Sequence, residues 1–467
     1  MIHDAHGYWI EDAGLQPVFP ALDGERQFDT LVVGGGFTGL WAAYHLKRAD
    51  PGLKVGLVES HRIGHGPSGR NGGFTNAMWI SFASLVDRYG VQPALDLARA
   101  AERSVLQVGE FCEEYEVDAW YRLSGYLNVS TSPAQDGVWK RNLEAMKAAG
   151  IEEGPREMTP AEVQAVCASP AFRGAVHYGV AATIQPARLA FGIRAACDSL
   201  GVELFEESPV VRIEEGPAET TVFTNRGRAD TRRLVLANGP TLASHGSPLS
   251  NNVTLASSHM VITEPVPDVI AELGWDGGEA ISDCRALLNY FRTTPDGRIA
   301  FGWGGGRIAA GGRRTGRAEV DPQVVSEVIG NLRRYFPMLA GTEIEHAWGG
   351  PIDASATHQP HVVRLPSGRS FAAFGYTGNG VGPSQLVGRT LASLVLDLED
   401  EYSHLPFVEP VGALTRVPPE PLRWVGGAMI REAIGSKEEA EMNGRTVDPV
   451  SRMISRVPGL IGFHIGR

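Results

Sequence analysis

A glycine pattern between a strand and a helix constrains the fold more than any other feature of this sequence. Gly34, Gly36 and Gly39 lie where the apolar segment TLVV gives way to the helical pattern FTGLWAAYHLKRA. In a dinucleotide-binding fold the first such glycine permits the turn, the second lets a pyrophosphate approach the backbone, and the third allows close helix packing. Glu59 ends the next strand, KVGLVES, where it can accept a hydrogen bond from a ribose hydroxyl. Residues 28–59 are therefore predicted to form a strand–helix–strand unit that binds a dinucleotide.

A second glycine-rich segment, GHGPSGRNGG at residues 64–73, distinguishes between two kinds of dinucleotide. NAD needs little from residues just after the second strand, whereas FAD runs deeper into a protein and more backbone must pass beside it. Glycines there remove side chains that would collide with the cofactor, and Ser68, Arg70 and Asn71 add polar groups that can reach the pyrophosphate or the ring edge. A mobile surface loop is the alternative interpretation. We predict FAD, with further contacts from Phe37, Thr38, Ser60, Gly72 and Gly73.

The order of the remaining patterns predicts an α/β protein of two discontinuous lobes. Helix starts are marked by Thr159-Pro160, with Glu162 completing a capping box, and by Asp321-Pro322. We expect a doubly wound, Rossmann-type FAD-binding lobe and a substrate lobe built on a mixed or antiparallel sheet, with a crevice between them. The expected boundaries are 1–117, 184–245 and 347–400 for the FAD-binding lobe, 118–183 (with a helical insert) and 246–346 for the substrate lobe, and 401–467 for a C-terminal helical tail.

Charge and composition exclude several other classes of protein. The chain has 42 basic and 54 acidic residues, and the basic ones are scattered, unlike the charge pattern of a protein that binds nucleic acid or anionic membranes. No run of about 18 apolar residues and no signal-peptide pattern occurs, so we expect a soluble, cytoplasmic protein. The four cysteines are far apart, which argues against a disulfide framework or a zinc site. No metal is expected, and the expected partner is a small molecule.

Taken together, the motifs VVGGGFTGL, VES and GHGPSGRNGG resemble the amino-terminal signature of FAD-dependent oxidoreductases of the D-amino-acid oxidase and glycine oxidase type. The likeness continues through IQPARLAFGIRAAC, LVLANGP, YFRTTPDGRIAFG, AWGGPIDASATHQPH and GYTGNGVGPSQLVG. The GRNGG ending is similar to gamma-glutamylputrescine oxidases, and the tail PPEPLRWVGGAMIREAI resembles a subgroup described as aminophosphonate oxidoreductases. The resemblance implies FAD that is bound noncovalently and an activity on C–N bonds.

The resemblance also implies which residues hold the more distant parts of FAD. Val211 would meet the adenine end, and Asn238 and Gly239 would pass beside the cofactor. A loop before a helix would meet the flavin, and it consists of Gly378, Asn379, Gly380 and Val381. The N-terminus of that helix carries about half a positive charge, which would stabilise the anion that reduction places on the flavin.

For the substrate, the resemblance implies hydride transfer from carbon to flavin N5, promoted by positioning and desolvation more than by a dedicated base. Tyr290 and Arg292 alternate onto one strand face and are candidates for the catalytic pocket together with Trp348, although a structural role is the competing interpretation. D-amino-acid oxidases clamp the substrate carboxylate with an arginine after a Trp-x-Gly run, and Pro351 stands at that position. An α-carboxylate substrate is therefore in doubt.

The electron acceptor is a second open point. Several relatives that oxidise sarcosine use a lysine near flavin N5 to promote reaction with oxygen, and no lysine occurs between residues 148 and 436. Either His259 assists, or the electrons pass to a different acceptor. We expect oxidation of a small primary or secondary amine to an imine and then an aldehyde, with oxygen or another electron acceptor. A D-amino-acid dehydrogenase or oxidase, and a noncatalytic FAD-binding subunit of an oligomeric complex, are the alternatives.

Overall fold

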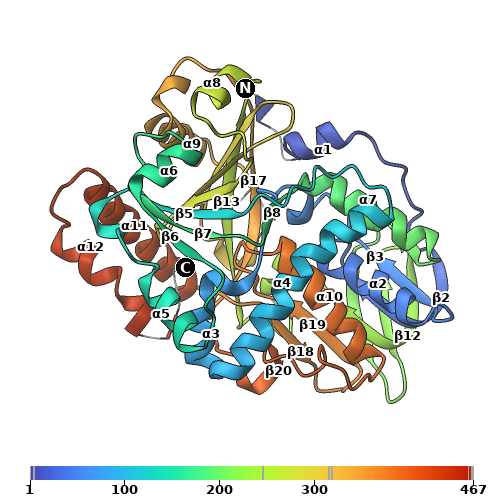
Figure 1. Ribbon diagram of the computed structural model, residues 1–467. Helices are drawn as coiled ribbons and strands as arrows, with labels where there is room; N and C mark the ends of the chain where they lie inside the picture. Colours follow the sequence, from blue (N-terminus) through green and yellow to red (C-terminus); the bar gives the residue numbers. More distant parts are fainter. Residues whose placement is uncertain are drawn as a thin grey trace.

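The computed structural model describes residues 2–3, 6–244, 247–313, 316, 319–460 and 462–463. Two large sheets form its centre, and helices cover their outer faces (Figure 1). The expected boundary at 245/246 and the final residues of the expected tail, 464–467, lie outside the described residues.

The first sheet is built around the unit predicted from the glycine pattern. β2 (Gly24–Val33), α2 (Phe37–Ala49) and β3 (Val55–Val58) follow one another, and β2 pairs in parallel with β3 and with β12 (Gly227–Leu236). The strand order is β9-β3-β2-β12-β19-β18-β20, and the β10–β11 hairpin joins β12. The other strands are β9 Glu203–Phe205, β10 Val210–Glu215, β11 Thr220–Thr224, β18 His361–Arg364, β19 Ser370–Phe374 and β20 Val408–Pro410. The Rossmann-type lobe is thus confirmed.

Four helices form an apolar layer with one face of this sheet: α2, α4 (Val91–Glu114), α7 (Pro186–Ser199) and α10 (Val381–Val395). α10 crosses α2 closely, because a Cβ placed on Gly388 would lie 2.4 Å from the Cβ of Trp41. This crossing brings the N-termini of α2 and α10 to the same edge of the sheet. The neighbouring helices are α1 Tyr8–Ala13, α3 Phe82–Tyr89 and α5 Lys140–Ala148.

The second sheet has the order β1-β17-β13-β16-β15-β14-β5-β7-β6 and mixes parallel with antiparallel pairs. Its strands are β1 Ile2–His3, β5 Tyr126–Ser130, β6 Arg156–Met158, β7 Gly174–Tyr178, β13 Val253–Thr263, β14 Ala280–Asp283, β15 Asn289–Thr293, β16 Ile299–Trp303 and β17 Ile344–Ser355. A short separate pair joins β4 (Phe74–Asn76) and β8 (Ala181–Thr183). Val261, Phe291 and Phe301 pack with α9 (Pro322–Tyr335) on one face. The residues between them along the strands therefore face the first sheet.

Two local predictions are confirmed on the α9 side of this sheet. α6 (Pro160–Val166) starts with the capping box of Thr159 and Glu162. α9 starts at Pro322, with the side chain of Asp321 accepting a hydrogen bond from the N–H of Gln323. α8 (Pro267–Glu272) lies on the same side of the molecule, near the top of Figure 1.

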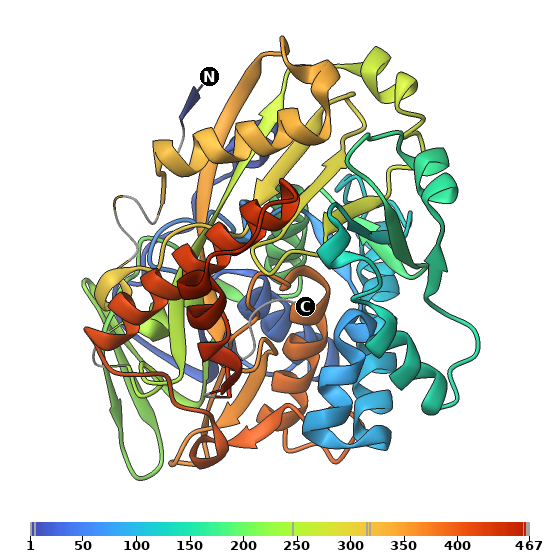
Figure 2. The same cartoon turned by 90° about the vertical axis from the view of Figure 1, so that its left-hand side faces the viewer.

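One expected boundary, 346/347, falls inside β17, which continues to Ser355. The tail contributes β20 to the edge of the first sheet and then forms α11 (Leu422–Met442), α12 (Pro449–Ile454) and α13 (Val457–Leu460). Figure 2 shows α11 and α12, in red, across the middle of the molecule. None of the described helices is long and apolar enough to cross a membrane.

Candidate active site

A cavity of about 890 Å³ lies between the two sheets and collects residues from distant parts of the chain. Both glycine-rich segments line it, and so do the turn after β12, the start of α10, the inner face of the second sheet and α11. Of the predicted site residues, the following line it: Gly34, Gly36, Phe37, Thr38, Glu59, Ser60, Ser68, Arg70, Asn71, Gly72, Asn238, Gly239, Tyr290, Trp348, Gly378, Asn379, Gly380 and Val381.

Residues 34–39, here called the first glycine loop, contain four glycines, and Gly34, Gly36 and Gly39 each allow a close approach. Gly34 has a φ of 111°, and a Cβ there would lie 2.6 Å from the carbonyl oxygen of Ala237. A Cβ on Gly39 would lie only 1.9 Å from the carbonyl oxygen of Gly34, so this glycine packs α2 against the turn without lining the cavity itself. Gly36 leaves the start of α2 uncapped by its own side chain and open to the cavity.

Residues 64–73, the second glycine loop, lie directly against the first. The Ser68 hydroxyl accepts a hydrogen bond from the N–H of Phe37 at 2.8 Å. Asn71 shapes its own loop, because its amide donates to the carbonyl oxygen of Ser68 at 2.7 Å and its Oδ1 accepts from the N–H of Gly73 at 2.8 Å. The indole N–H of Trp348 donates to the carbonyl oxygen of Arg70 at 2.8 Å. The two loops and β17 therefore form one connected wall.

The carboxylate of Glu59 lies at the dinucleotide end of the cavity. Its Oε2 accepts from the N–H of Gly35 at 2.8 Å, and its Oε1 accepts from the Ser60 hydroxyl at 2.8 Å and from the N–H of His61 at 3.0 Å. The predicted contact at Val211 is corrected: this side chain is 65% exposed, and Val210 lines the cavity instead. A register shift between Val210 and Arg212 in the β10–β11 pair displaces the strand by one residue there.

The start of α10 meets the cavity beside the first glycine loop. Gly380 is its N-cap and provides no side-chain hydrogen bond, so the positive end of the helix is open. The Thr38 and Tyr376 hydroxyls lie 2.6 Å apart and connect the first turn of α2 to the segment before α10. Asp353 of β17 accepts from the N–H of Gly375 at 2.7 Å, and burial raises the pKa of its carboxyl group to about 6, against the lowering effect of that hydrogen bond.

These features fit FAD. The helices α2 and α10 both begin at the cavity with a glycine as N-cap, which provides no side-chain cap of its own, and their N-termini are suited to a pyrophosphate and to the negative charge of a reduced flavin. The Oδ1 atom of Asn238 is buried and has no hydrogen-bond partner among the described residues. Gly34, Gly36 and Gly72 line the cavity with backbone alone, and a Cβ on any of them would meet neighbouring protein atoms. The described residues could therefore hold FAD along the first sheet.

The inner face of the second sheet closes the other end of the cavity. Ser258 and Met260 of β13 line it, and so does Tyr290 of β15. The hydroxyls of Tyr290 and Ser258 lie 2.7 Å apart, and Ser258 donates to the carbonyl oxygen of Trp303 at 2.9 Å. Burial raises the pKa of Tyr290 to about 12, so this phenol stays protonated at neutral pH.

The structure corrects the candidate catalytic role of His259. Because side chains along β13 alternate between the two faces, His259 points away from the cavity, toward the start of α9. Its Nε2 accepts from the N–H of Asp321 at 3.0 Å. Burial lowers its pKa to about 4, opposed by nearby Asp321, so the ring is neutral near pH 7. A cation that assists the reaction with oxygen is not provided by His259.

Arg292 lies behind the cavity wall rather than on its surface. Its Nε donates to the carbonyl oxygen of Gly72 at 2.9 Å and its Nη2 to that of Ile184 at 2.7 Å, and the guanidinium lies 4.7 Å from the centre of the Trp9 ring. A Cβ on Gly73 would lie 2.0 Å from the same Ile184 oxygen, so Gly73 also acts from behind. Arg292 and Gly73 hold the second glycine loop against β8 and are not in position to touch a ligand.

The tail helix α11 forms a further wall that the sequence did not predict. Its cavity-lining residues are Leu422, Arg423, Gly426, Gly427, Ile430, Arg431 and Ile434. Glu438, one turn further on, accepts hydrogen bonds from the N–H groups of Ala286 (2.6 Å) and Leu287 (3.4 Å), both of which line the cavity. In the sequence, this helix is marked only by apolar residues and glycines at helical spacing. Such a pattern does not show which surface the helix packs against.

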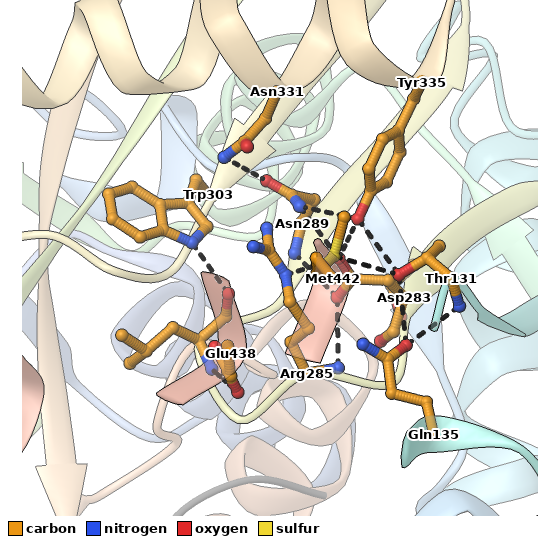
Figure 3. A network of polar contacts seen from close by, with 12 residues as sticks. Thr131, Gln135, Asp283, Arg285, Asn289, Trp303, Asn331, Tyr335, Glu438 and Met442 are labelled. Carbon is orange, nitrogen blue, oxygen red and sulfur yellow. Dashed lines mark hydrogen bonds and ion pairs between the residues drawn. The ribbon is translucent and has the colours of Figure 1, made fainter. Parts of the chain in front are cut away.

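Glu438 belongs to a buried polar network between α11, α9 and the second sheet (Figure 3). At its centre, Asp283 accepts from the Nε of Arg285 at 2.9 Å, from the amide of Asn289 at 2.8 Å and from the hydroxyl of Tyr335 at 2.6 Å. Burial raises the pKa of the Glu438 carboxyl group to about 7, opposed by Arg285. The attachment of α11 to the cavity wall therefore involves a carboxyl group that titrates near neutral pH.

We expect Glu438→Gln to reduce the pH dependence of stability. Because the folded protein holds the Glu438 proton more tightly than the unfolded chain, this stabilisation is fully present below the ordinary pKa of 4.5 and is lost as the pH rises through about 7. Glutamine keeps an acceptor for Ala286 and cannot ionise. Urea unfolding at about pH 5.5 and about pH 8 should therefore show a smaller loss of stability in the variant than in the wild type.

The exposed Glu110 on α4 provides the control, since Glu110→Gln removes a carboxylate without touching this network. A Glu438→Gln protein that loses as much stability as the wild type between the two pH values would contradict the assignment.

Known proteins share both the sequence pattern and the fold. The family model described as DAO, FAD dependent oxidoreductase, matches residues 29–394. A gamma-glutamylputrescine oxidoreductase of Escherichia coli (strain K12) is 29% identical over 438 residues, which cover 90% of this chain and 96% of that protein. A glycine oxidase of Bacillus licheniformis is 22% identical over 79% of this chain and 94% of its own length. The crystal structure of glycine oxidase from Geobacillus kaustophilus matches with a TM-score of 0.68 at 19% identity, over 84% of this chain and 100% of that one.

Proposed function

Because this chain belongs to the DAO family of FAD-dependent oxidoreductases, we propose that it oxidises the C–N bond of a small primary or secondary amine to an imine, which water splits into an aldehyde and ammonia or an amine. The observation that carries the proposal is the continuity of one cavity. It runs from the two glycine loops, past the start of α10, to the chamber formed by Tyr290, Met260 and α11. Bound FAD would supply the hydride acceptor, and oxygen or another acceptor would reoxidise it.

The residues of the chamber are suited to holding a neutral amine. Ser258 donates its only hydroxyl proton to the carbonyl oxygen of Trp303, so Tyr290 donates to Ser258. The lone pairs of the Tyr290 oxygen are then available to accept an N–H of the substrate. A neutral amine can donate such a hydrogen bond, whereas its charged conjugate acid is disfavoured in a desolvated chamber. The site therefore favours the neutral, reactive form of the substrate.

The choice among amines follows from β17, which lies in the same sheet as Tyr290. Pro351 and Ile352 of β17 line the cavity where a D-amino-acid oxidase would carry its carboxylate clamp. We therefore favour an amine whose reacting carbon bears no carboxylate, such as gamma-glutamylputrescine, for which one relative is named, or an aminophosphonate, over a D-amino acid. We assign Tyr290 as the residue that contacts the substrate and Trp348 as a residue that positions the second glycine loop.

Anaerobic titration of the FAD-loaded protein tests this function. The panel contains gamma-glutamylputrescine, 2-aminoethylphosphonate and its N-methyl form, sarcosine and D-alanine. We expect one of the amines without an α-carboxylate to bleach the visible flavin absorbance. Bleaching by D-alanine alone would instead identify a D-amino-acid dehydrogenase or oxidase. A flavin that no amine reduces would overturn the proposal in favour of a noncatalytic FAD-binding subunit.

A further inference from the structure

We infer that the substrate amine carries a methylene chain, and that this chain binds in an apolar channel between the end of β16 and the tail helix α11. Six residues that line the cavity form the channel: Leu288, Gly304, Ile308, Gly427, Ile430 and Ile434. The inference rests on the proposed function and names the substrate class of that site. α11 begins at Leu422, beyond the residues 29–394 that the family model matches, so the tail supplies one wall of the channel.

Gly304 forms a floor of the channel without a side chain. Its N–H donates to the carbonyl oxygen of Leu288 at 2.9 Å, which continues the pairing of β15 with β16 past the end of β16. A Cβ on Gly302 would lie 2.2 Å from the ring of Tyr290, so this phenol covers Gly302. Gly304 is on the same face, about 7 Å further along the strand. A Cβ there would have the Leu288 carbonyl oxygen, at 3.7 Å, as its nearest contact, so the space above Gly304 is open.

α11 lies across this floor and forms the roof of the channel. A Cβ on Gly427 would lie 3.2 Å from the side chain of Ile308, and a Cβ on Gly435 would lie 4.0 Å from the side chain of Leu287. These two contacts place the helix over residues 287–308, the segment that carries both Tyr290 and Gly304. The two isoleucines of the channel stand one turn apart on α11 and both line the cavity. The roof is therefore made of branched apolar side chains.

The arginines of α11 are bound elsewhere. Arg423 donates to the carbonyl oxygens of Pro418 (2.9 Å) and Val253 (3.0 Å), at the far end of β13 from Met260. The guanidinium of Arg431 lies 5.5 Å from the centre of the Trp303 ring, which belongs to the apolar cluster on the α9 side of the sheet. It is also ion-paired there with glutamates 327 and 432. The channel is therefore apolar where α11 covers it.

The polar groups of the chamber lie at the Tyr290 end of this channel. Ser258 and Tyr290 share a hydrogen bond, and Ser282, which also lines the cavity, pairs with Tyr290 across β14 and β15. A molecule with an amine at one end and methylene groups beside it matches this division, because its carbons are removed from water while its nitrogen meets hydroxyl groups. The phosphonate of 2-aminoethylphosphonate would instead lie in apolar surroundings. Among the candidate amines, the channel favours gamma-glutamylputrescine, whose amine ends a methylene chain.

The test measures affinity against chain length in FAD-loaded wild type, Gly304→Ala and Gly304→Val. Gly304 has no positive φ, so its backbone accepts both side chains. Ethylamine, butylamine and hexylamine are titrated anaerobically, with the visible flavin spectrum and thermal stabilisation as binding measurements. The corresponding n-alkanols, which have no amine to oxidise, are titrated in the same way. Burial of each methylene is worth about fourfold in affinity, so we expect the wild type to bind butylamine about 10-fold more tightly than ethylamine. Gly304→Val should reduce this ratio to below about twofold, and Gly304→Ala to an intermediate value.

Gly341→Val is the matched control, because Gly341 is exposed and nothing lies within 4 Å of the added Cβ; its ratio should equal that of the wild type. Equal wild-type affinities for ethylamine and butylamine, or an unchanged ratio in Gly304→Val, would overturn the inference. Tighter binding of 2-aminoethylphosphonate than of butylamine would also overturn it. If no amine reduces the wild-type flavin while the n-alkanols still bind more tightly with length and lose that gain in Gly304→Val, the proposed function fails and the channel stands.

Discussion

Gly39→Ala is expected to yield a protein that no longer retains FAD. The new Cβ would lie 1.9 Å from the backbone oxygen of Gly34, and Gly34 has no room to retreat, because it is itself in contact with the backbone of Ala237. α2 must then move away from β2, which misplaces the N–H groups at the start of the helix. We expect a cost on the order of 3 kcal/mol, which corresponds to about a 100-fold loss of FAD affinity if it falls on the bound state.

The measurement is the ratio of flavin to protein after purification, together with the midpoint of thermal unfolding. Gly330→Ala is the control: it lies exposed in α9, nothing lies within 4 Å of the added Cβ, and alanine has the higher helix propensity. A Gly39→Ala protein with a full complement of FAD would show that the first glycine loop does not hold the cofactor as described.

Arg292→Met is expected to cause the second large effect, a loss of stability together with weaker FAD binding. Arg292 is 1% exposed, and its removal leaves the carbonyl oxygens of Gly72 and Ile184 without their donors. Each buried group left unsatisfied costs about 1–3 kcal/mol, so we expect a total of about 2–5 kcal/mol. Because Gly72 lines the cavity, the loosened loop should also release FAD more readily.

Urea unfolding and the rate of FAD release measure the two parts of this prediction. Arg99→Met, on the exposed side of α4, removes a surface arginine and should change neither quantity by more than about 0.5 kcal/mol. Wild-type stability combined with slower turnover would instead indicate that Arg292 contacts the substrate, as the sequence first suggested.

Local patterns allowed much of the FAD-binding lobe to be predicted, because they depend on residues close in the chain. The glycines at 34, 36 and 39 require a turn between β2 and α2 whatever the rest of the protein does, and the structure forms it there. Thr159 and Glu162 likewise form the expected capping box, which involves residues three apart. In both cases backbone geometry within one turn decides the outcome.

Predictions that depended on the direction of a side chain were less reliable. His259 has the chemistry of a catalytic residue, but only the pairing of β13 with its neighbours decides that Ser258 and Met260 face the cavity. Val211 was displaced by a register shift within one strand pair. Strand alternation is readable in a sequence, but which of its two faces is buried against a ligand is not.

By itself, the sequence determined the dinucleotide-binding unit and the need for two bare backbone segments, since glycine geometry and helix starts are local properties. Only the tertiary structure decided what those segments contact, which strand face forms the chamber, and that α11 walls it. Those outcomes join residues such as Glu438 and Ala286, or Arg431 and Gly305, that lie far apart in the chain. They depend on which apolar faces are buried together, and a pattern of apolar residues does not specify its partner.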